Sequence, residues 1–312
     1  MIAATINFFL SGSSDLTNTA TTDSTILSGR TSLVIGASGI VGSHIVRHLI
    51  LRGERPPLAL SRSHREGDTI QWIQGDVADP THIDLPQFEI LYCTASARLL
   101  ANALPVLCRS SLKRVVLFTT TSISTKTSSN DAEERAGILE YANAEKQLVE
   151  ICNTLGVSWT VLRPTLIYDE GRDANISRLA VFIRRFGFIP LCGRGHGLRQ
   201  PVHAEDCAIG AINAASSSLA SNKIYEIPGG DTIPYNEMIG RIFDGLGRRR
   251  AAIALPPFLW VTVFRLTQNY FPGLKASMGP RMAQDLVFDQ SSAVADFGWA
   301  PREFRPRFDV VS

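Results

Sequence analysis

Short apolar runs alternate with segments of helical periodicity along the first half of the chain. The segment after the first run has Val41, Ile45 and Leu49 spaced four apart, on one face of a helix. Such alternation is typical of an α/β fold, a doubly wound parallel sheet with helices on both faces. The runs that we expect to form strands are 32–35, 57–61, 70–76, 89–95, 115–121 and 159–164.

After Pro164 the alternation becomes irregular. Residues 175–187 and 235–247 have helical spacing and end at a glycine, while 188–193 and 223–230 read as short strands. We therefore expect a smaller α+β lobe, interleaved with the end of the sheet. The predicted units are an N-terminal extension at 1–29, a sheet-bearing domain at 30–170 and the smaller lobe at 171–312.

The N-terminal extension begins with a brief apolar stretch and continues as a Ser/Thr-rich segment. A secretory signal needs basic residues first and a longer apolar core, so we do not interpret this segment as one. It is expected to be a flexible extension, or residues ahead of the true start.

The composition excludes several classes of protein. With 45% hydrophobic and 19% charged residues over 312 positions, the chain is predicted to be globular. Its formal net charge of +2 creates no field for nucleic acid, which we exclude as a partner. The five cysteines lie far apart without a C-x-x-C pair, so we predict no disulfide framework, no metal site and a cytoplasmic location.

The first predicted strand leads directly into three glycines spaced three apart, Gly36, Gly39 and Gly42. A strand, G-x-x-G-x-x-G and an amphipathic helix together form a pyrophosphate site. The first glycine allows the tight turn, the second lets backbone approach the phosphates, and the third lets the helix pack on the strand. The sequence therefore predicts that a dinucleotide binds at the N-terminus of this helix.

The end of the second predicted strand distinguishes NAD from NADP. An acidic residue there would bond the ribose 2′-hydroxyl of NAD, but this chain has Ser61, Arg62 and Ser63, with no acid before Glu66. Arg62 can pair with a 2′-phosphate, which favours NADP; the alternative is a solvated surface arginine. Asp76, at the end of the third strand, is expected to contact the adenine.

Several stretches occur together in the order of one family. They are GASGIVG (36–42), GDVADP (75–80), the threonine triplet 119–121, LRPTLIY (162–168), RQPVHAEDCA (199–208), IYEIPGG (224–230) and the tail 286–304. Through them, about residues 30–305 resemble the extended and atypical short-chain dehydrogenase/reductase family, of the NAD-dependent epimerase/dehydratase type. The resemblance implies a Rossmann domain, an NAD or NADP cofactor, and a nucleotide sugar or related small molecule as substrate.

The resemblance also implies which residues contact the cofactor. The predicted set lies in the glycine loop and at the ends of the following strands. Its members are Gly36, Ala37, Ser38, Gly39, Ile40, Val41, Gly42, Arg62, Asp76, Val77, Thr94, Ala95, Thr119 and Pro164.

The catalytic residues of the family are a Ser or Thr at the end of the fifth strand and a Y-x-x-x-K pair in the next helix. Thr121 resembles the first, although it is equally readable as an ordinary strand residue. The second is broken, because Tyr141 is followed by Lys146 at plus five. Plus four returns to within about 40° of the starting face of a helix, whereas plus five lies about 140° away.

When the chain is aligned with the family on the residues downstream of this helix segment, Tyr141 falls where the family has its lysine. Gly137 then falls where the family has its tyrosine. Without a neighbouring ammonium, a tyrosine has little to lower its pKa from about 10 toward neutrality. Lys126 is another nearby ammonium; it either reaches the nicotinamide ribose or a substrate phosphate, or is simply solvated. His203 and Asp206 either line the substrate lobe or form a helix N-terminus with a packed histidine.

Three hypotheses of function follow. The first is an NAD(P)-dependent oxidoreductase or epimerase that uses hydride transfer, with Thr121 and Tyr141 handling a substrate hydroxyl, and Lys126 as a further candidate. The second is a cofactor-binding scaffold without turnover, which the broken Y-x-x-x-K favours. The third is a peripheral membrane protein that acts on or near a lipid-linked substrate.

The third hypothesis rests on residues 248–275. Arg248, Arg249 and Arg250 precede an apolar stretch whose Leu259 and Trp260 would share one helical face with further apolar residues. The stretch contains prolines and an arginine and is too short to span a bilayer. The alternative, which we favour, is that this face packs against the core of the smaller lobe.

Overall fold

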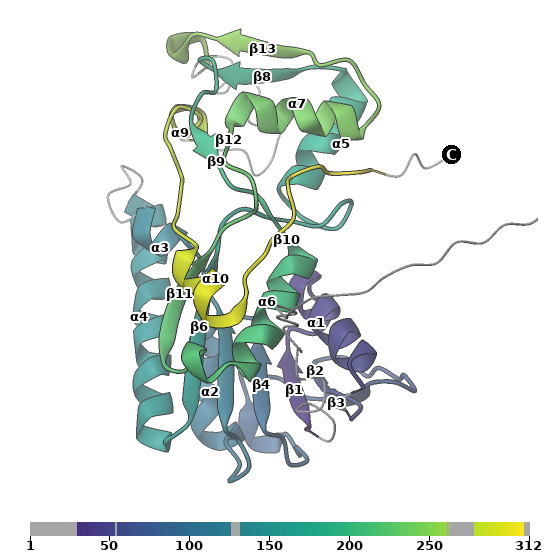
Figure 1. Cartoon of the computed structure of the whole chain (residues 1–312), viewed down its shortest axis with the longest axis vertical. Coiled ribbons are helices and arrows are strands. Elements are labelled where there is room, and N and C mark those ends of the chain that lie inside the picture. Colours follow the sequence, from purple (N-terminus) through teal and green to yellow (C-terminus); the bar gives the residue numbers. More distant parts are fainter. Residues whose placement is uncertain (1–29, 54, 126–131, 261, 263–277, 309–312) are drawn as a thin grey trace, which may run out of the picture.

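A seven-stranded parallel sheet forms the centre of the computed structural model, which describes residues 30–53, 55–125, 132–260, 262 and 278–308 (Figure 1). Its strand order is β11-β6-β5-β4-β1-β2-β3, and every neighbouring pair is parallel. The strands are β1 (Ser32–Ile35), β2 (Leu58–Ser61), β3 (Gln71–Gln74), β4 (Ile90–Cys93), β5 (Arg114–Phe118), β6 (Ser158–Pro164) and β11 (Lys223–Ile227).

Helices cover both faces of this sheet. One face carries α1 (Ile40–Leu51), α6 (Ala204–Ser216) and α10 (Ser291–Phe297), and the other carries α2 (Ala97–Leu107) and α4 (Ala132–Leu155). Two buried clusters, one on each face, form the core. The predicted doubly wound α/β fold is therefore confirmed. Its central strands are continuous apolar runs because a sheet covered on both faces buries alternate side chains in opposite directions.

The strand order reverses between β1 and β4. From β1 the chain proceeds through β2 to β3, then crosses back to β4 and continues through β5 and β6 to β11. Ligands of open α/β sheets bind at such a switch point, outside the carboxyl ends of the strands. The short α3 (Ser122–Thr125) follows β5 at this carboxyl edge.

The smaller lobe lies beyond the carboxyl edge of the sheet (Figure 1). Its described residues form three two-stranded sheets, two helices of eleven residues and a separate buried hydrophobic cluster. Its elements are β7 (Ile167–Tyr168) with β10 (Val202–His203), β8 (Ile189–Cys192) with β13 (Ala252–Leu255), β9 (Leu198–Arg199) with β12 (Ile233–Pro234), and the helices α5 (Ile176–Phe186), α7 (Tyr235–Gly245) and α9 (Met278–Arg281).

The two units exchange segments along the sequence. β11, α6 and α10 come from the second half of the chain, yet they complete the sheet and cover one of its faces. The chain also forms short 3₁₀ helices at Pro80–His82 and Ser218–Ala220.

Some expectations from the sequence lie outside the described residues, among them the extension 1–29, Lys126 and most of 261–277. Among the helices that the structure does describe, none has the length and hydropathy needed to cross a bilayer. Trp260, which the sequence placed on a lipid-facing helix face, is buried in the core of the smaller lobe, 8% exposed. For Trp260 the membrane expectation is therefore wrong and the core-packing alternative is correct.

Candidate functional site

The glycine loop between β1 and α1 has little space for side chains. Gly36 has φ +85°, a conformation that L residues rarely adopt, and a Cβ there would lie 2.4 Å from Thr94 Oγ1. A Cβ on Gly42 would lie 2.1 Å from the carbonyl oxygen of Gly36, so the first turn of α1 touches the end of β1 directly. These close approaches are the ones that the glycine spacing predicts.

No side chain of the described residues caps the N-terminus of α1. The N-cap residue is Gly39, which has no side chain to accept an N–H, and the first turn contains no acidic residue. The first N–H groups of a helix have no partner within the helix, and the helix dipole is positive there. Ser38 and Gly39 are exposed at the tip of the loop. The arrangement can therefore accept an anion such as a pyrophosphate.

Thr94 supports this loop from the neighbouring strand. Its Oγ1 lies 3.3 Å from the carbonyl oxygen of Ile35 and 3.2 Å from that of Gly36, and donates its single proton there. Thr94 and Ala95 follow β4, directly beside β1 at the switch point. The structure thus brings these two predicted cofactor residues together with the glycine loop.

The predicted adenosine residues lie at the carboxyl ends of β2 and β3. Arg62 is exposed, and within the described chain its guanidinium makes no hydrogen bond or ion pair, whereas the nearby Arg65 stacks over the ring of Trp72 at 5.1 Å. Asp76 Oδ1 accepts the N–H of Ala78 at 2.9 Å and stabilises the turn after β3. Val77, the next residue, is half-buried against the core cluster.

The other predicted residues gather where β5 and β6 end. Thr121 is buried, and its Oγ1 donates to the carbonyl oxygen of Pro164 at 3.1 Å. The backbone N–H of Thr121 donates to the same oxygen at 3.2 Å. The Thr121 hydroxyl proton is therefore engaged by the protein, and its oxygen is left as an acceptor.

A buried ion pair, which sequence reasoning missed, lies beside these threonines. Glu145 of α4 is buried against the sheet and accepts hydrogen bonds from both Nε and Nη2 of Arg163 on β6. It also accepts the hydroxyl proton of Thr119 at 2.8 Å. The available signal was an acid on the buried stripe of a helix, three and seven residues before Leu148 and Cys152. A buried carboxylate of this kind needs a cation from another element.

Tyr141 lies one turn before Glu145 on α4. Residues four apart share a helix face, so Tyr141 projects on the same side, one turn nearer the N-terminus of the helix. Its side chain is 49% exposed. Lys146 is exposed and lies 3.9 Å from Glu150, so it is directed away from Tyr141, as the plus-five spacing predicts. A further turn back, a Cβ on Gly137 would meet nothing within 4 Å.

Comparison with known proteins agrees with this geometry. A family model described as NAD(P)H-binding matches residues 36–180. A UDP-glucose 4-epimerase of Vibrio cholerae is 21% identical over 301 residues, 86% of this chain and 90% of that protein. A mitochondrial NADH dehydrogenase [ubiquinone] 1 alpha subcomplex subunit 9 of Dictyostelium discoideum is 30% identical, but over only 28% of this chain and 24% of its own length.

Solved structures share the fold over nearly the whole chain. An epimerase of Methanothermobacter thermautotrophicus superposes with a TM-score of 0.67 at 16% identity, covering 89% of this chain and 90% of its own. The UDP-glucuronic acid 4-epimerase of Bacillus cereus, solved with UDP-glucuronic acid and NAD, has a TM-score of 0.64 at 14% identity, covering 88% and 94%. Together these comparisons show that residues 36–180 match an NAD(P)H-binding model and that the chain shares its overall fold with these epimerases.

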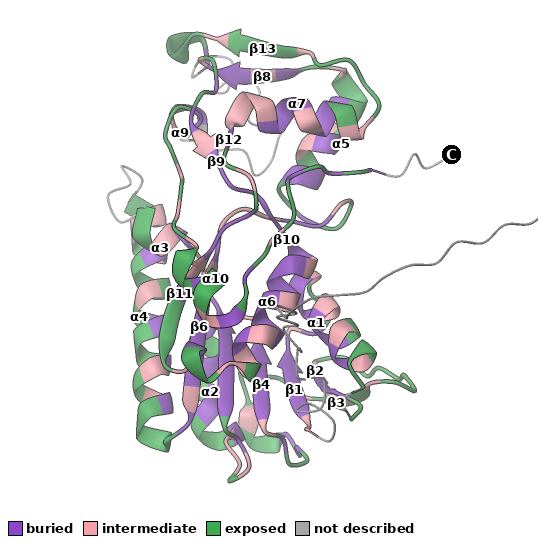
Figure 2. Ribbon diagram, in the orientation of Figure 1, coloured by how far each residue is buried: buried purple, intermediate pink, exposed green. Residues whose placement is uncertain are grey.

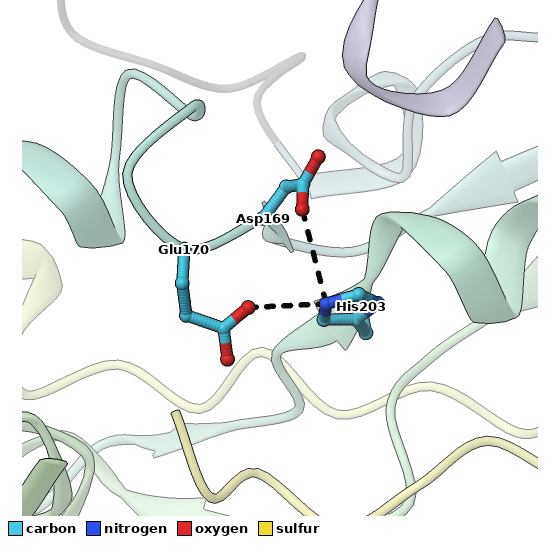
Figure 3. Close-up of side chains that lie close together, drawn as sticks. All are labelled: Asp169, Glu170 and His203. Carbon is cyan, nitrogen blue, oxygen red and sulfur yellow. Dashed lines mark hydrogen bonds and ion pairs between the residues drawn. The ribbon is translucent and has the colours of Figure 1, made fainter. Parts of the chain in front are cut away.

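The chain also has a polar cluster between α1 and the smaller lobe (Figure 3). Asp169 and Glu170, which follow β7, each offer a carboxylate oxygen to His203 of β10, at 4.0 and 3.1 Å from its Nε2. His44 of α1 approaches the other oxygen of Asp169 at 3.3 Å. Among the described residues, Asp169, Glu170 and His203 have the spacing of a metal site.

The tautomer of His203 argues against a metal ion. Its Nδ1 accepts the backbone N–H of Glu205 at 3.1 Å and caps α6, so the ring proton is on Nε2 and is donated to Glu170. A metal-binding Nε2 would need its proton on Nδ1, facing the N–H of Glu205. Burial would raise the pKa of Glu170, but the hydrogen bonds from His203 and from backbone N–H groups hold it below the ordinary value. The cluster is therefore a helix cap with a packed histidine.

Arg172 connects this cluster to the cofactor end of α1. Its Nη1 lies 2.9 Å from Asp169 Oδ2, and its Nη2 donates to Ser43 Oγ at 2.8 Å. Ser43 follows Gly42 in the first turns of α1, where the helix dipole is positive. Asp169 balances the charge of this guanidinium, which is half-exposed beside the first turns of α1, so Arg172 is a further candidate for contact with phosphate.

Proposed function

We propose that this protein is an NAD(P)-dependent oxidoreductase or epimerase that acts on a nucleotide sugar or related small molecule by hydride transfer. The observation that carries the proposal is the similarity to a UDP-glucose 4-epimerase over 86% of this chain and 90% of that enzyme. The uncapped helix N-terminus behind three closely packed glycines supports the cofactor half of the proposal.

NADP is the proposed cofactor in preference to NAD. Arg62 follows β2 with its guanidinium unengaged by described residues, where a 2′-phosphate would need a cation. The pyrophosphate is assigned to the N–H groups around Gly39 and to Arg172, and the adenine to Asp76 and Val77. Thr94, Ala95 and Thr119 line the inner side of this site, and Pro164 closes it.

The proposed chemistry needs few protein groups. The bound nicotinamide supplies the hydride acceptor or donor. Thr121, whose own proton is donated to Pro164, can accept a hydrogen bond from the substrate hydroxyl and orient it. Tyr141, half-exposed on the face of α4 that carries Glu145, is assigned to the nicotinamide ribose or the substrate. The buried Glu145–Arg163 pair positions α4 against the sheet.

A second candidate function is cofactor binding without turnover. Two observations favour it: Lys146 is directed away from Tyr141, and the Thr121 hydroxyl proton is held by a backbone carbonyl. A general base is therefore harder to identify here than in a protein with an intact Y-x-x-x-K.

For either function we propose a reducing compartment such as the cytoplasm. All five cysteines of the sequence lie in the described part of the chain, and all are free.

The test uses the purified full chain. Fluorescence titration with NADPH and NADH measures binding, and product analysis with UDP-glucose, UDP-glucuronic acid and UDP-N-acetylglucosamine measures epimerisation or redox turnover. We expect binding of both cofactors, tighter for NADPH, and turnover of at least one sugar nucleotide. Binding without turnover across the panel would support the scaffold function. No binding of either cofactor would overturn both.

A further inference from the structure

Two long segments of the smaller lobe contain basic residues and no acidic ones. Residues 174–204 and 245–260 contain eight of the 31 Lys and Arg residues of the chain and none of its 29 Asp and Glu residues. The rest of the chain is therefore acidic on balance. A near-neutral protein of formal charge +2 thus has a strongly polarised charge distribution, with the positive end on this lobe.

Four of these arginines gather at the outer end of the lobe, the end that lies farthest from the sheet. Arg184 and Arg185 occupy the last turn of α5, and Arg248 and Arg249 precede β13; all four are exposed. The hydrogen bond from Arg248 Nη1 to the carbonyl oxygen of Ile183, at 3.4 Å, holds the two segments side by side. The neighbouring Arg250 forms ion pairs with Glu237 and Asp244 of α7 and is not counted among these four.

Large apolar side chains are exposed at the same end. Phe186 and Phe188 flank the turn into β8, Ile253 lies on β13, and Phe258 follows it with 71% of its surface exposed. The three phenylalanines are all the exposed phenylalanines of the described chain. Figure 2 shows β13 and the helical residues that follow it mostly as exposed ribbon along the outer edge. Val181 and Leu259 extend this apolar surface.

An anionic bilayer is the occupant that these features fit. Exposed apolar side chains partition into the region between headgroups and acyl chains, while flanking arginines pair with anionic headgroups. A second copy of the chain presenting the same face would bring the two sets of arginines together and is opposed by their repulsion. The absence of acidic residues from both segments matches a flat anionic surface.

We propose that the outer end of the smaller lobe, formed by the end of α5, the start of β8, and β13 with its flanking turns, binds the surface of anionic membranes. This footprint differs from the one that the sequence indicated, because α5 and β8 contribute to it and Trp260 does not. The proposal is independent of the enzymatic function, since none of these residues belongs to the cofactor site.

The test is vesicle flotation of the full chain at low salt. Vesicles of phosphatidylcholine alone are compared with vesicles that also contain phosphatidylglycerol, and added salt is titrated against bound protein. We expect flotation only with the anionic vesicles and release by salt, because screening weakens each arginine contact. Failure to float with anionic vesicles at low salt would overturn the proposal.

Substitutions localise the contact. Changing Arg184, Arg185, Arg248 and Arg249 to Gln should weaken vesicle binding about 100-fold or more, since each basic residue contributes about 1 kcal/mol near an anionic surface. The matched control changes four exposed arginines of the larger unit to Gln and should leave flotation unchanged; it uses Arg47, Arg52, Arg55 and Arg98. Equal losses in both variants would show nonspecific attraction and contradict the proposal.

A second variant tests the apolar part of the proposed membrane contact without changing any arginine. Phe258→Gln alters one highly exposed side chain, so the melting temperature should not change, and it should weaken flotation severalfold at every salt concentration. Unchanged flotation would argue against the footprint. If size-exclusion chromatography showed a dimer that Phe258→Gln dissociates, without lipid binding, the face would be an interface between copies and the proposal would be wrong.

Discussion

The two halves of the proposed cofactor site differ in what holds them in place. At the pyrophosphate end, backbone meets backbone: a Cβ on Gly42 would lie 2.1 Å from the Gly36 carbonyl oxygen. At the nicotinamide end, the position before Tyr141 on the same face, Gly137, has open space around it. Binding that rests on close backbone contact tolerates no change, whereas a catalytic side chain on an exposed helix face can be replaced without cost to the fold.

Of the substitutions that test this comparison, Gly39→Val is expected to have the largest effect, a loss of dinucleotide binding. Gly39 has φ −73°, which valine adopts readily, and its Cβ would approach only the Gly36 carbonyl oxygen, at 3.2 Å. The side chain would instead occupy the space of the phosphates. Losing two charge-assisted hydrogen bonds at about 1.5 kcal/mol each weakens dinucleotide binding about 100-fold or more. Fluorescence titration measures the loss.

The control for Gly39→Val is its melting temperature without cofactor, which should stay close to that of the parent. Gly42→Val should instead lower the melting temperature, because its Cβ meets backbone at 2.1 Å. Full cofactor affinity in the Gly39 variant would show that the phosphates do not bind at this loop.

A second experiment introduces a tyrosine–lysine pair at the nicotinamide end of the proposed site. The double variant Gly137→Tyr with Tyr141→Lys places a tyrosine and a lysine four apart on the face that carries Glu145. The new ammonium would lower the pKa of the new phenol, and a positioned base contributes about 100-fold or more to rate. We expect that gain in turnover with the sugar nucleotides, measured by product formation.

Each single substitution is the control for the double variant. Gly137→Tyr alone lacks the ammonium, and Tyr141→Lys alone lacks the phenol, so neither should reproduce the gain. If the double variant folds and binds cofactor but its turnover equals that of the parent, the face of α4 does not reach the nicotinamide.

Arg62→Ala tests the adenosine end and should have a smaller effect. Removing the guanidinium is expected to weaken NADPH binding about tenfold, because a charge-assisted contact to a phosphate is lost, with little change for NADH. Parallel titrations with the two cofactors measure the ratio. Equal losses for both would mean that Arg62 does not contact the 2′-phosphate.

The smallest effect concerns the scaffold behind the glycine loop. The hydrogen bond from Arg302 holds the pKa of Glu205 at about 2, below its ordinary 4.5, and His48 of α1 adds a second contact at 3.0 Å. A depressed carboxyl pKa stabilises the fold above pH 4.5, and this contribution is lost as pH falls toward 2.

The free energy of unfolding of Arg302→Met should therefore be about 1 kcal/mol lower than that of the parent near pH 6, a small difference because the pair is partly exposed. The difference should shrink as the pH falls through the range between 4.5 and 2. Denaturant unfolding at several pH values measures it. A difference that does not depend on pH would assign the effect of Arg302 to packing instead.

Features of the site were predictable from the sequence when the residues that form them lie close together along the chain. The glycine loop, the alternation of strands and helices and the defect in Y-x-x-x-K all follow from spacings of a few residues. The structure has Lys146 directed away from Tyr141, as the spacing requires. The partners of buried charges could not be found in this way. Glu145 meets Arg163 and Thr119 across two strands, and Arg172 meets Ser43 over 129 positions.

The sequence by itself determined the doubly wound fold and the glycine loop that we propose as the dinucleotide site, because apolar periodicity and glycine conformation are local properties of the backbone. Only the tertiary structure decided which charges are neutralised. Burial makes an unpaired charge costly, and the element that supplies its partner is known only once the chain has packed. Tertiary packing also decides that Trp260 is buried in the core while Phe258, two residues earlier and equally apolar, is largely exposed.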